Sequence, residues 1–575
     1  MDQRAKDLIG ISDSLFAKRL PILSLWQATA EQFYPERADY TWVRSMGMEF
    51  ASHLMTGIPA MASRDLANSI SAMLRPPGQA WFHARTQSDK INTDTHCRIW
   101  LDWASEQMRQ AMYDNMSGWS RSSKEGDRDF VTIGNACISL RPNQDFTGLA
   151  FRTHHMRDVA FSEDSSGRVN EVHVKRKISN INLVKLFPDT VPDTVRTAAD
   201  KDPHGEVQCR HIVLPTDNYD SIGSAKQERA PGGDRRTNKR KLPFTSVWVC
   251  VDHDTILEEI GQWQMGYICP RWETVPGFGY GYAPPTVVNI ADARMLQQIT
   301  LTLLEAGQKA VDPPMKAVGQ VIQGGVNGFA GGITWVDAEY DERTGPALEP
   351  LMKTQPNLGW GVDRESRIAK IIADGHYLNQ IRLPDTSHAR TAFEVSKLWE
   401  EFIRNTTPLF EPIQSEYNGA VCDQTFEMIL RMNGFGPVAM MPPLLRGQDI
   451  RFIFDSPLTL AATRANAQAF TQVGQLLQLG MAIDPAVKHD VDVDQAFRDA
   501  VTGSGAPAKW LVPKEIADPQ KAQDRQAAAQ AQTMQQVAGA ADQGATIAGK
   551  IGQAATMLQQ GGILPQQQPQ QGGAV

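Results

Sequence analysis

The sequence lacks the features that mark secreted, membrane-spanning and disulfide-rich proteins. Its six cysteines are scattered over 575 residues and include no CxxC pair, which favours buried thiols over a disulfide framework or a zinc site. No apolar run approaches the roughly 18 residues of a membrane span. The first ten residues, MDQRAKDLIG, carry charges where a signal peptide has its apolar segment. We therefore expect no membrane span and no targeting segment.

The chain also lacks an excess of positive charge. It has 57 Lys and Arg against 65 Asp and Glu, which gives a formal net charge of -8. Proteins that grip nucleic acid over a wide face are usually basic. The balance argues against a tight nucleic-acid binder, but it is compatible with a protein along which DNA must slide.

No catalytic motif is present. The sequence has no GxSxG, HExxH or kinase set. Residues 544–551, GATIAGKI, have the GxxxxGK spacing of a phosphate-binding loop, but Ile551 stands where Ser or Thr is needed and the segment lies in a low-complexity tail. We expect no catalytic residues and no cofactor.

Two possible metal sites are also weak. Asp490, Asp492 and Asp494 alternate, but carboxylates at this position also suit the start of the helix that follows. His154 and His155 lie in a strand-like run, where neighbouring side chains point to opposite faces. We therefore expect no bound metal.

The spacing of apolar residues changes along the chain, from a helical period to a strand-like one. Residues 1 to about 120 are predicted to be helical, notably Met1–Thr29 and Thr95–Met116. From Phe130 to about Tyr267 short β-branched runs predict a mostly β unit, with a helical interruption near Ile181–Phe187. The runs are VTIGNACISL, GLAFRTHHM, VNEVHVKRKI, VQCRHIVL and FTSVWVCV.

The middle of the chain predicts a helical hairpin. It consists of a helix (Val287–Ala310), a Gly-rich segment with strand-like pieces (Met315–Trp360), a second helix (Val362–Leu378), a polar loop (Asn379–Arg390) and a long helix (Thr391–Met432) kinked by prolines. Such a hairpin cannot bury its apolar stripes by itself, and identical copies around a ring would supply the missing neighbours.

The last part of the chain loses hydrophobic content. A short strand is predicted at Ile450–Phe454, and helices at Thr459–Leu479 and Val491–Val501. From Asp518 the composition shifts to Ala, Gln and Gly, which predicts a frayed helix followed by disorder.

Four blocks of sequence resemble the portal (head-to-tail connector) proteins of short-tailed bacteriophages. They are LWQATAEQFYPERADY (Leu25–Tyr40), RDLANSISAMLRPPGQAWF (Arg64–Phe82), GFGYGYAPP (Gly277–Pro285) and LNQIRLPD (Leu378–Asp385). The resemblance covers roughly residues 1–515. It implies a dodecameric ring at one capsid vertex that conducts double-stranded DNA during packaging and ejection.

The resemblance also implies a fold class, α+β, and a division into parts. These are a wing (1–286, helical and then mostly β from about 130), a first stem helix (287–310), a clip (311–361), a second stem helix (362–378), a tunnel loop (379–390), a long kinked helix returning to the wing (391–455), a crown (456–517) and a tail without an assigned role (518–575).

The partners implied by the resemblance are other copies of the chain and DNA in the channel. The packaging terminase would dock first, followed by tail adaptor and nozzle proteins. Major capsid, scaffolding and internal ejection proteins would also make contact. The expected location is the head-tail junction of the virion, and the host cytoplasm during assembly.

The candidate DNA-channel contacts are sparse. The tunnel loop carries Arg382, His388 and Arg390, with Asp385 offsetting one charge, and the stem offers Lys309, Arg367 and Lys370. Each phosphate neutralised adds about -0.9 to the salt slope of binding, so a dense ring of cations would hold DNA too tightly to let it pass. A sparse mixture favours a guide.

A second basic cluster lies in the polar stretch Ser221–Lys241. It could contact nucleic acid or the capsid, although a solvated loop is the simpler interpretation; its basic residues are Arg235, Arg236, Lys239, Arg240 and Lys241. The same choice applies to Lys175–Lys177, where the simpler interpretation is a solvated strand edge.

Three other functions compete with the portal. A packaging ATPase would need an intact phosphate loop. A tail adaptor or an internal ejection protein would be another ring or tube component, and the length and the N-terminal blocks favour the portal over both. A membrane pore would need a span.

Overall fold

The computed structural model describes residues 2–143, 145–222, 242–318, 358–381, 413–437 and 440–454, with parts of 322–350, 401–411, 470–503 and 512–530. Helices and sheets are mixed, as expected. The N-terminal part is helical; its elements are α1 (Gln3–Lys18), α2 (Leu20–Phe33), η1 (Pro35–Arg37), α3 (Ile58–Leu74), α4 (Asp89–Thr93), α5 (Thr95–Tyr113) and α6 (Trp119–Ile133).

The helical prediction for the N-terminal part is confirmed, with one difference. The stretch expected to be helical from Met1 to Thr29 forms two helices that meet at Arg19. Pro21 follows this junction, and proline is favoured in the first turn of a helix, where its missing N–H costs nothing. The second helix therefore starts anew and turns its apolar side toward the β unit.

The β unit has two antiparallel sheets. The larger has the order β4-β5-β6-β7-β8 and the smaller the order β3-β2-β9. The strands are β2 (Ile138–Pro142), β3 (Leu149–Thr153), β4 (Val159–Glu163), β5 (Val169–Ser179), β6 (Glu206–Pro215), β7 (Phe244–Cys250), β8 (Thr255–Gln262) and β9 (Tyr267–Ile268). The predicted helical interruption is α7 (Asn180–Leu186), and the short helices α8 (Asp193–Lys201) and α9 (Thr216–Ser221) were not predicted.

One predicted strand starts too early. The run VTIGNACISL was expected to be extended from Val131, but α6 continues to Ile133 and β2 begins only at Ile138. Residues 130 to 140 are buried throughout, so their apolar side chains do not distinguish a buried helix from a buried strand. Gly134, with φ +75°, ends the helix in the left-handed conformation.

Distant parts of the sequence meet in a two-stranded sheet. The predicted strand at Ile450–Phe454 is confirmed as β16, and it pairs with β1 (Phe82–Thr86), which was not predicted. Trp81 and Phe82 lie at this pairing and belong to the largest apolar core, and Phe452 packs against it. This core joins α3, α5 and α6 to the segment after residue 413. All six cysteines are buried, as expected.

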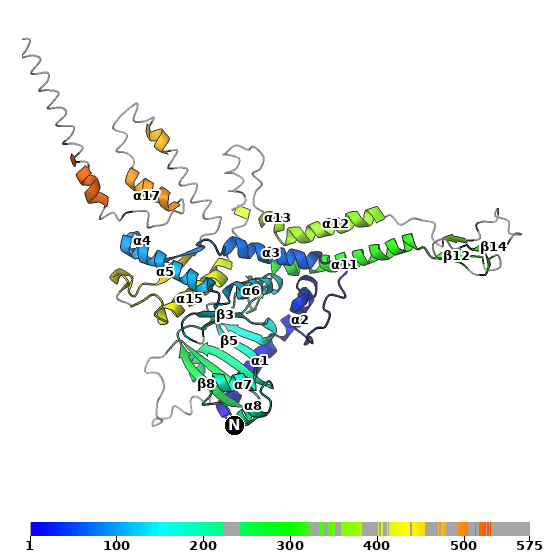
Figure 1. The fold of residues 1–575 in the computed structure, drawn as a ribbon, viewed down its shortest axis with the longest axis horizontal. Coiled ribbons are helices and arrows are strands. Elements are labelled where there is room, and N and C mark those ends of the chain that lie inside the picture. Colours follow the sequence, from blue (N-terminus) through cyan, green and yellow to red (C-terminus); the bar gives the residue numbers. More distant parts are fainter. Residues whose placement is uncertain are drawn as a thin grey trace, which may run out of the picture.

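Two long helices project from the body side by side (Figure 1). They are α11 (Pro284–Val311) and α12 (Leu358–Gly375), close to the predicted bounds. Small strand pairs lie between them in sequence and beyond their far ends: β12 (Met315–Ala317) with β15 (Leu348–Pro350), and β13 (Ile322–Gln323) with β14 (Trp335–Val336). The second helix was expected to reach Leu378, but it ends at Gly375 and α13 (Leu378–Ile381) follows.

The described C-terminal elements return to the body. A π-helical segment, η4 (Ile413–Gly419), leads into α15 (Ala420–Arg431), which matches the end of the helix expected at Thr391–Met432; most of residues 391–412 lies outside the described residues. The short α17 (Val493–Gly503) matches the helix expected at Val491–Val501. Most of the predicted helix Thr459–Leu479 and of the tail lies outside the described residues. No helix in the part that the structure describes could cross a membrane.

Candidate functional site: the paired helices and their attachment

The two projecting helices pack closely through apolar residues. Ile368 and Ile372 of α12 are buried against Ala293 and Leu296 of α11. A side chain at Gly375 would place its Cβ 2.7 Å from the Asn289 amide carbon, so this position needs glycine for the close approach. The hairpin predicted from sequence is therefore one packed unit near the body.

Buried polar groups add specificity at the base of this pair. Nδ1 of His376 lies 2.8 Å from the Ile372 carbonyl oxygen and 3.2 Å from the Asn289 amide nitrogen. Burial lowers the pKa of His376 to about 4, so the ring is neutral at pH 7. Farther out, the Thr300 hydroxyl donates to Glu365 at 2.9 Å.

The stem cations predicted from sequence are on these helices and exposed. Arg367 and Lys370 lie one turn apart on α12, and Lys309 lies near the end of α11. Asp363 precedes Arg367 by four residues and Asp374 follows Lys370 by four, so negative charge offsets both cations on the same face. This surface of mixed charge can make weak contacts with phosphates.

The other predicted contacts cannot be placed. Arg382, His388 and Arg390 of the expected tunnel loop lie outside the described residues, as do Arg235, Arg236, Lys239, Arg240 and Lys241. Of the LNQIRLPD block, only Leu378–Ile381 is described, as helix α13, with Ile381 buried in the main core.

The GFGYGYAPP block fastens the start of α11 to the end of α6. The Asn135 side-chain amide donates to the Gly281 carbonyl at 2.7 Å and accepts from the Gly281 N–H at 2.8 Å. The Thr286 hydroxyl donates to the Thr132 carbonyl at 2.8 Å. The Trp272 N–H donates to the Gly134 carbonyl at 2.9 Å. The block is thus a joint that sets the direction in which α11 leaves the body.

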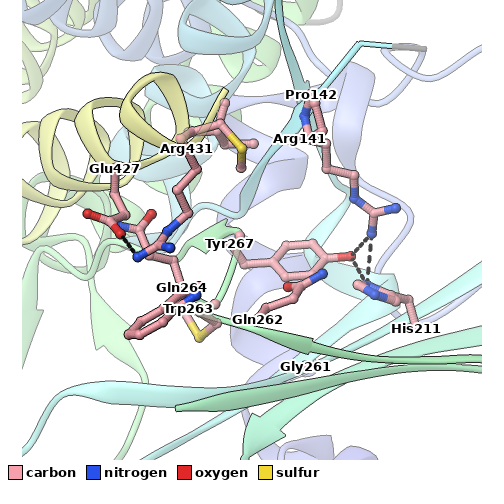
Figure 2. A pocket seen from close by; sticks show the side chains of 14 residues that line it. Arg141, Pro142, His211, Gly261, Gln262, Trp263, Gln264, Tyr267, Glu427 and Arg431 are labelled. Atoms are coloured by element: carbon pink, nitrogen blue, oxygen red, sulfur yellow. Dashed lines mark hydrogen bonds and ion pairs between the residues drawn. The ribbon is translucent and has the colours of Figure 1, made fainter. Parts of the chain in front are cut away.

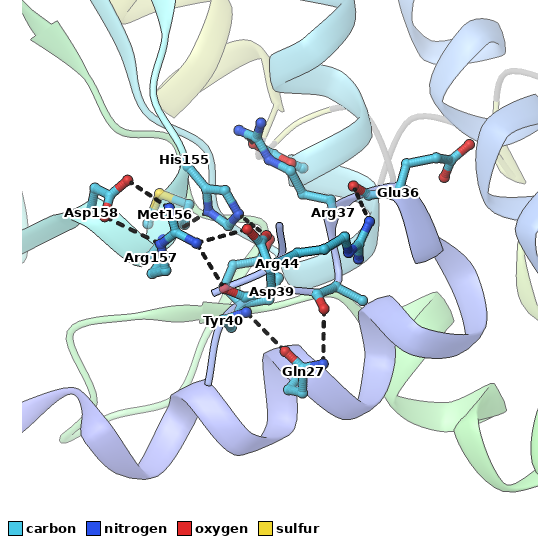
Figure 3. Close-up of polar contacts among 12 residues, drawn as sticks. Gln27, Glu36, Arg37, Asp39, Tyr40, Arg44, His155, Met156, Arg157 and Asp158 are labelled. Atoms are coloured by element: carbon cyan, nitrogen blue, oxygen red, sulfur yellow. Dashed lines mark hydrogen bonds and ion pairs between the residues drawn. The ribbon is translucent and has the colours of Figure 1, made fainter. Parts of the chain in front are cut away.

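The ERAD sequence of the first block is a second joint (Figure 3). Gln27 of α2 donates to the Ala38 carbonyl at 3.0 Å and accepts from the Tyr40 N–H at 2.8 Å. Asp39 binds His155 and, at 2.7 Å, Arg157, which both precede β4. The block therefore ties the N-terminal helices to the β unit.

This joint predicts a pH effect. Burial alone would raise the pKa of Asp39, but the hydrogen bond with His155 and the Arg157 charge lower it. A carboxyl whose pKa is lower in the folded state contributes stability above its unfolded pKa and loses it as the pH falls through the folded value. We expect Asp39→Asn to lower the free energy of unfolding at pH 7 by about 1 kcal/mol, given the partial exposure of Asp39. In urea unfolding, the difference from wild type should shrink below about pH 4. Asp200→Asn, at an exposed carboxylate of α8, is the control; a difference that does not shrink at all as the pH falls below the unfolded pKa would contradict the charge-based explanation.

The adjacent residues His154 and His155 contact different partners. The His154 ring lies 2.9 Å from the Ser139 hydroxyl, whereas His155 binds Asp39. Burial and the nearby Arg176 lower the pKa of His154 well below its usual value. Within the described ranges, no group of three His, Cys, Asp or Glu side chains could hold a metal.

Two buried arginines, neither singled out from sequence, hold the η4 segment. Arg75, in the LRPPG sequence at the end of α3, binds Asp127 of α6 and lies 3.3 Å from the Asn418 amide oxygen. Arg271 donates to Glu416 at 2.8 Å and to Glu163 at 2.7 Å. The partners are up to 343 residues away in sequence, so charge patterning could not reveal them; the one local signal is the aromatic and proline residues around each arginine.

The basic triplet Lys175–Lys177 lies in the part of β5 that pairs with β6 alone, beyond the last residue paired with β4, and Lys175 and Lys177 are exposed, as expected for a strand edge. Lys175 sits over the Phe16 ring, Arg176 lies 3.1 Å from the His154 ring, and Lys177 pairs with Glu206 at 3.5 Å. Packing and pairing therefore occupy these charges.

A cavity of about 260 Å³ lies between the β unit and α15 (Figure 2). Tyr267 and His211 point toward each other, with 2.6 Å between the hydroxyl and Nδ1, and the other ring nitrogen of His211 is 2.7 Å from the Ser246 hydroxyl. Burial and the Arg141 charge lower the pKa of His211 well below its usual value. These groups are engaged with one another, and Arg431 pairs with Glu427 over the Trp263 ring.

Comparison with known families identifies the chain. The family model described as bacteriophage head to tail connecting protein matches residues 5–512. The chain belongs to this family. A member of the family joins head to tail, so its place is the head-tail junction of the virion.

Two curated relatives match this head-to-tail connecting protein along most of their length. A probable portal protein of Bordetella phage BPP-1 is 24% identical over 552 residues, which is 93% of each chain. A portal protein of Salmonella phage epsilon15 is 22% identical over 473 residues, 79% of each chain. The resemblance inferred from the four blocks is confirmed.

Two solved structures are similar at low scores. They are titled as the virion of a native gene transfer agent particle and the neck of an empty one, at TM-scores of 0.33 and 0.34 and 10% identity. They cover 72% and 73% of this chain and 85% and 86% of theirs.

Proposed function

We propose that this head-to-tail connecting protein is a portal protein, a ring subunit through which double-stranded DNA enters the capsid and leaves it. The observation that carries the proposal is the match over residues 5–512, together with two portal proteins aligned over 93% and 79% of the chain. The paired helices support it, because α11 and α12 leave apolar side chains exposed that copies in a ring would cover.

In this proposal the elements take the parts that the resemblance implies. The body up to residue 286 is the wing, α11 and α12 are the stem, and the strand pairs between them are the clip. Because residues 378–381 form α13 and Ile381 is buried, the tunnel loop begins at residue 382 instead of 379 and runs to 390; residues 391–455 return to the wing, and 456–517 form the crown. The ring is a dodecamer. Terminase and later the adaptor and nozzle proteins dock at the clip, and capsid, scaffolding and internal ejection proteins contact the ring elsewhere.

The proposed protein has no catalysis of its own. The family model describes a protein that connects head to tail, and the polar groups of the described cavity are engaged with one another. A packaging ATPase would need a phosphate loop, which the sequence lacks. A tail adaptor or an internal ejection protein is the remaining alternative, and the extended match to portal proteins favours the portal.

Native mass spectrometry with negative-stain imaging of the full-length protein tests the proposal. Twelve copies of the 63.6 kDa chain give closed rings of about 760 kDa with a hole of duplex width. Overproduced rings with a neighbouring copy number would still support a portal. A monomer with ATPase activity would overturn the proposal.

The tunnel-loop assignment predicts that substitutions in the loop affect DNA retention without affecting ring assembly. Arg382→Ala or Arg390→Ala should leave ring assembly intact and reduce the DNA retained in filled heads, because each change removes one phosphate contact from every subunit. Arg367→Ala and Lys370→Ala should have a weaker effect, since Asp363 and Asp374 already offset these charges.

Packaged DNA is measured per head by nuclease protection at two salt concentrations. Lys201→Ala, an exposed cation at the end of α8, is the control and should retain DNA like wild type. Loss of the rings in the loop variants would contradict the guide assignment, as would unchanged DNA retention.

A further inference from the structure

The connection between α2 and α3 exposes an unusual amount of apolar surface. From residue 41 to residue 56 the chain has turns but no helix or strand, and we call this segment the apolar loop. Connections of this length without secondary structure are uncommon in compact domains and are usually functional. Six of its large hydrophobic side chains are exposed; they are Trp42, Val43, Met46, Met48, Phe50 and Met55.

The exposed area is large enough for an interface. Met46 is 104% exposed and Val43 76%, and the other four side chains are 38–52% exposed. Together they present apolar surface on the order of several hundred Å², the range in which exposed patches mark interaction sites. A lone exposed methionine needs no explanation, whereas six such side chains on one segment indicate a surface that is covered in the assembled protein.

The apolar loop is held in position at both ends. At its start, Arg44 donates to the Pro35 carbonyl at 2.8 Å and lies over the rings of Trp42 and Phe50, at 5.8 and 5.1 Å. At its end, Gln297 of α11 accepts from the N–H groups of Met55 and Thr56, at 2.7 and 3.0 Å. Its apolar side chains are therefore presented on an ordered frame, which lowers the entropic cost of binding.

The position and charge of the loop favour another copy of the chain as its partner. The loop leaves the body beside α11 (Figure 1), the helix that stands next to neighbouring subunits in the proposed ring. Arg44 and Glu49 are its two charges apart from His53, which is too little positive charge for DNA. A cyclic ring needs two different surfaces per subunit that fit each other.

The same chain carries a second apolar surface of the required kind. Val288, Ala291 and Met295 follow at spacings of three and four residues on α11, so they share one face, and that face points away from the buried Ala293. Val288 is 70% exposed. From these observations we infer that the apolar loop is a subunit contact that packs on the next copy of this chain in the ring, with the outward face of α11 as its seat.

The inference rests on the proposed ring, so the experiment separates the two. Met46→Ser/Phe50→Ser is compared with Leu186→Ser/Ile260→Ser, a control pair on α7 and β8, which are also exposed and lie far from α11 (Figure 1). Full-length protein is diluted, and the ring fraction is measured by native mass spectrometry and sedimentation velocity. We expect the loop variant to need at least tenfold more protein to form half its rings, with the control like wild type.

A second measurement needs no variant. Hydroxyl-radical oxidation of Met46 is compared in the ring and monomer fractions of wild-type protein separated on a gradient, and at least fivefold slower oxidation is expected in the ring. Equal ring formation by the loop variant, or equal oxidation of Met46 in both fractions, overturns the subunit contact while the portal proposal stands. Absence of rings in wild type overturns the portal proposal and the contact with it.

Discussion

Replacing Gly134 with alanine should lower the free energy of unfolding by about 3–5 kcal/mol, from backbone strain and steric overlap together. Gly134 ends α6 with φ +75°, a conformation that disfavours any side chain. A Cβ there would also lie 2.5 Å from the Tyr282 carbonyl oxygen and the Ala283 nitrogen. The obstacle is backbone, and the paired hydrogen bonds between Asn135 and Gly281 prevent it from moving aside.

The measurement is urea unfolding of the full-length protein, with ring formation as a second readout. Gly167→Ala is the matched control, because Gly167 also has a left-handed φ of +78° but a Cβ added there would have no atom within 4 Å. Gly167→Ala should lower the free energy of unfolding by about 1 kcal/mol, because only the backbone strain is added. Equal losses in the two variants would show that the contact between α6 and the start of α11 does not require glycine.

Replacing Arg75 with methionine should cost about 3–5 kcal/mol, because it leaves a buried carboxylate without its partner. The side chains of Arg75 and Asp127 are both 2% exposed. Burial by itself would lower the pKa of Arg75, but the Asp127 carboxylate and Tyr417 raise it, so the guanidinium stays charged. The Arg75 guanidinium carbon lies 4.4 Å from the centre of the Tyr417 ring. Its loss should therefore also loosen η4.

The double variant Arg75→Met/Asp127→Leu tests the reason. Removing both charges should restore a large part of the stability, since a buried ion pair can often be replaced by apolar residues at little cost. Arg121→Ala, which breaks the exposed pair with Glu125, is the control and should have no measurable effect. A double variant as unstable as Arg75→Met would show that the arginine acts through shape and not through its charge. Chemical denaturation measures all three.

The elements that could be predicted from sequence are those with a clear local period. The alternation of β5, β6 and β7 and the stripes of α5, α11 and α12 located these elements to within a few residues. The prediction was wrong where burial is complete, as at Val131, because a residue buried on all sides gives no period. It also missed β1, whose partner β16 lies more than 360 residues away.

Sequence likewise located some residues of the candidate site and missed others. Lys309, Arg367 and Lys370 were expected to contact DNA from the stem helices. They lie on α11 and α12 and are exposed, because polar residues opposite an apolar stripe face solvent, and their contact with DNA stays a prediction. In the sequence, Arg75 and Arg271 cannot be distinguished from arginines on the surface, yet both are buried. The loop residues Arg382, His388 and Arg390 remain predictions.

The sequence by itself determined the helical hairpin, the β unit and the membership of a head-to-tail connecting family, because period, turn residues and short blocks are properties of neighbouring residues. Tertiary structure alone decided which charged residues form buried ion pairs and where close packing requires glycine, as at Gly134 and Gly375. It also decided that the apolar loop is exposed in a single chain. These depend on which distant segments meet, and the energies of close approach and of buried charge exist only once they do.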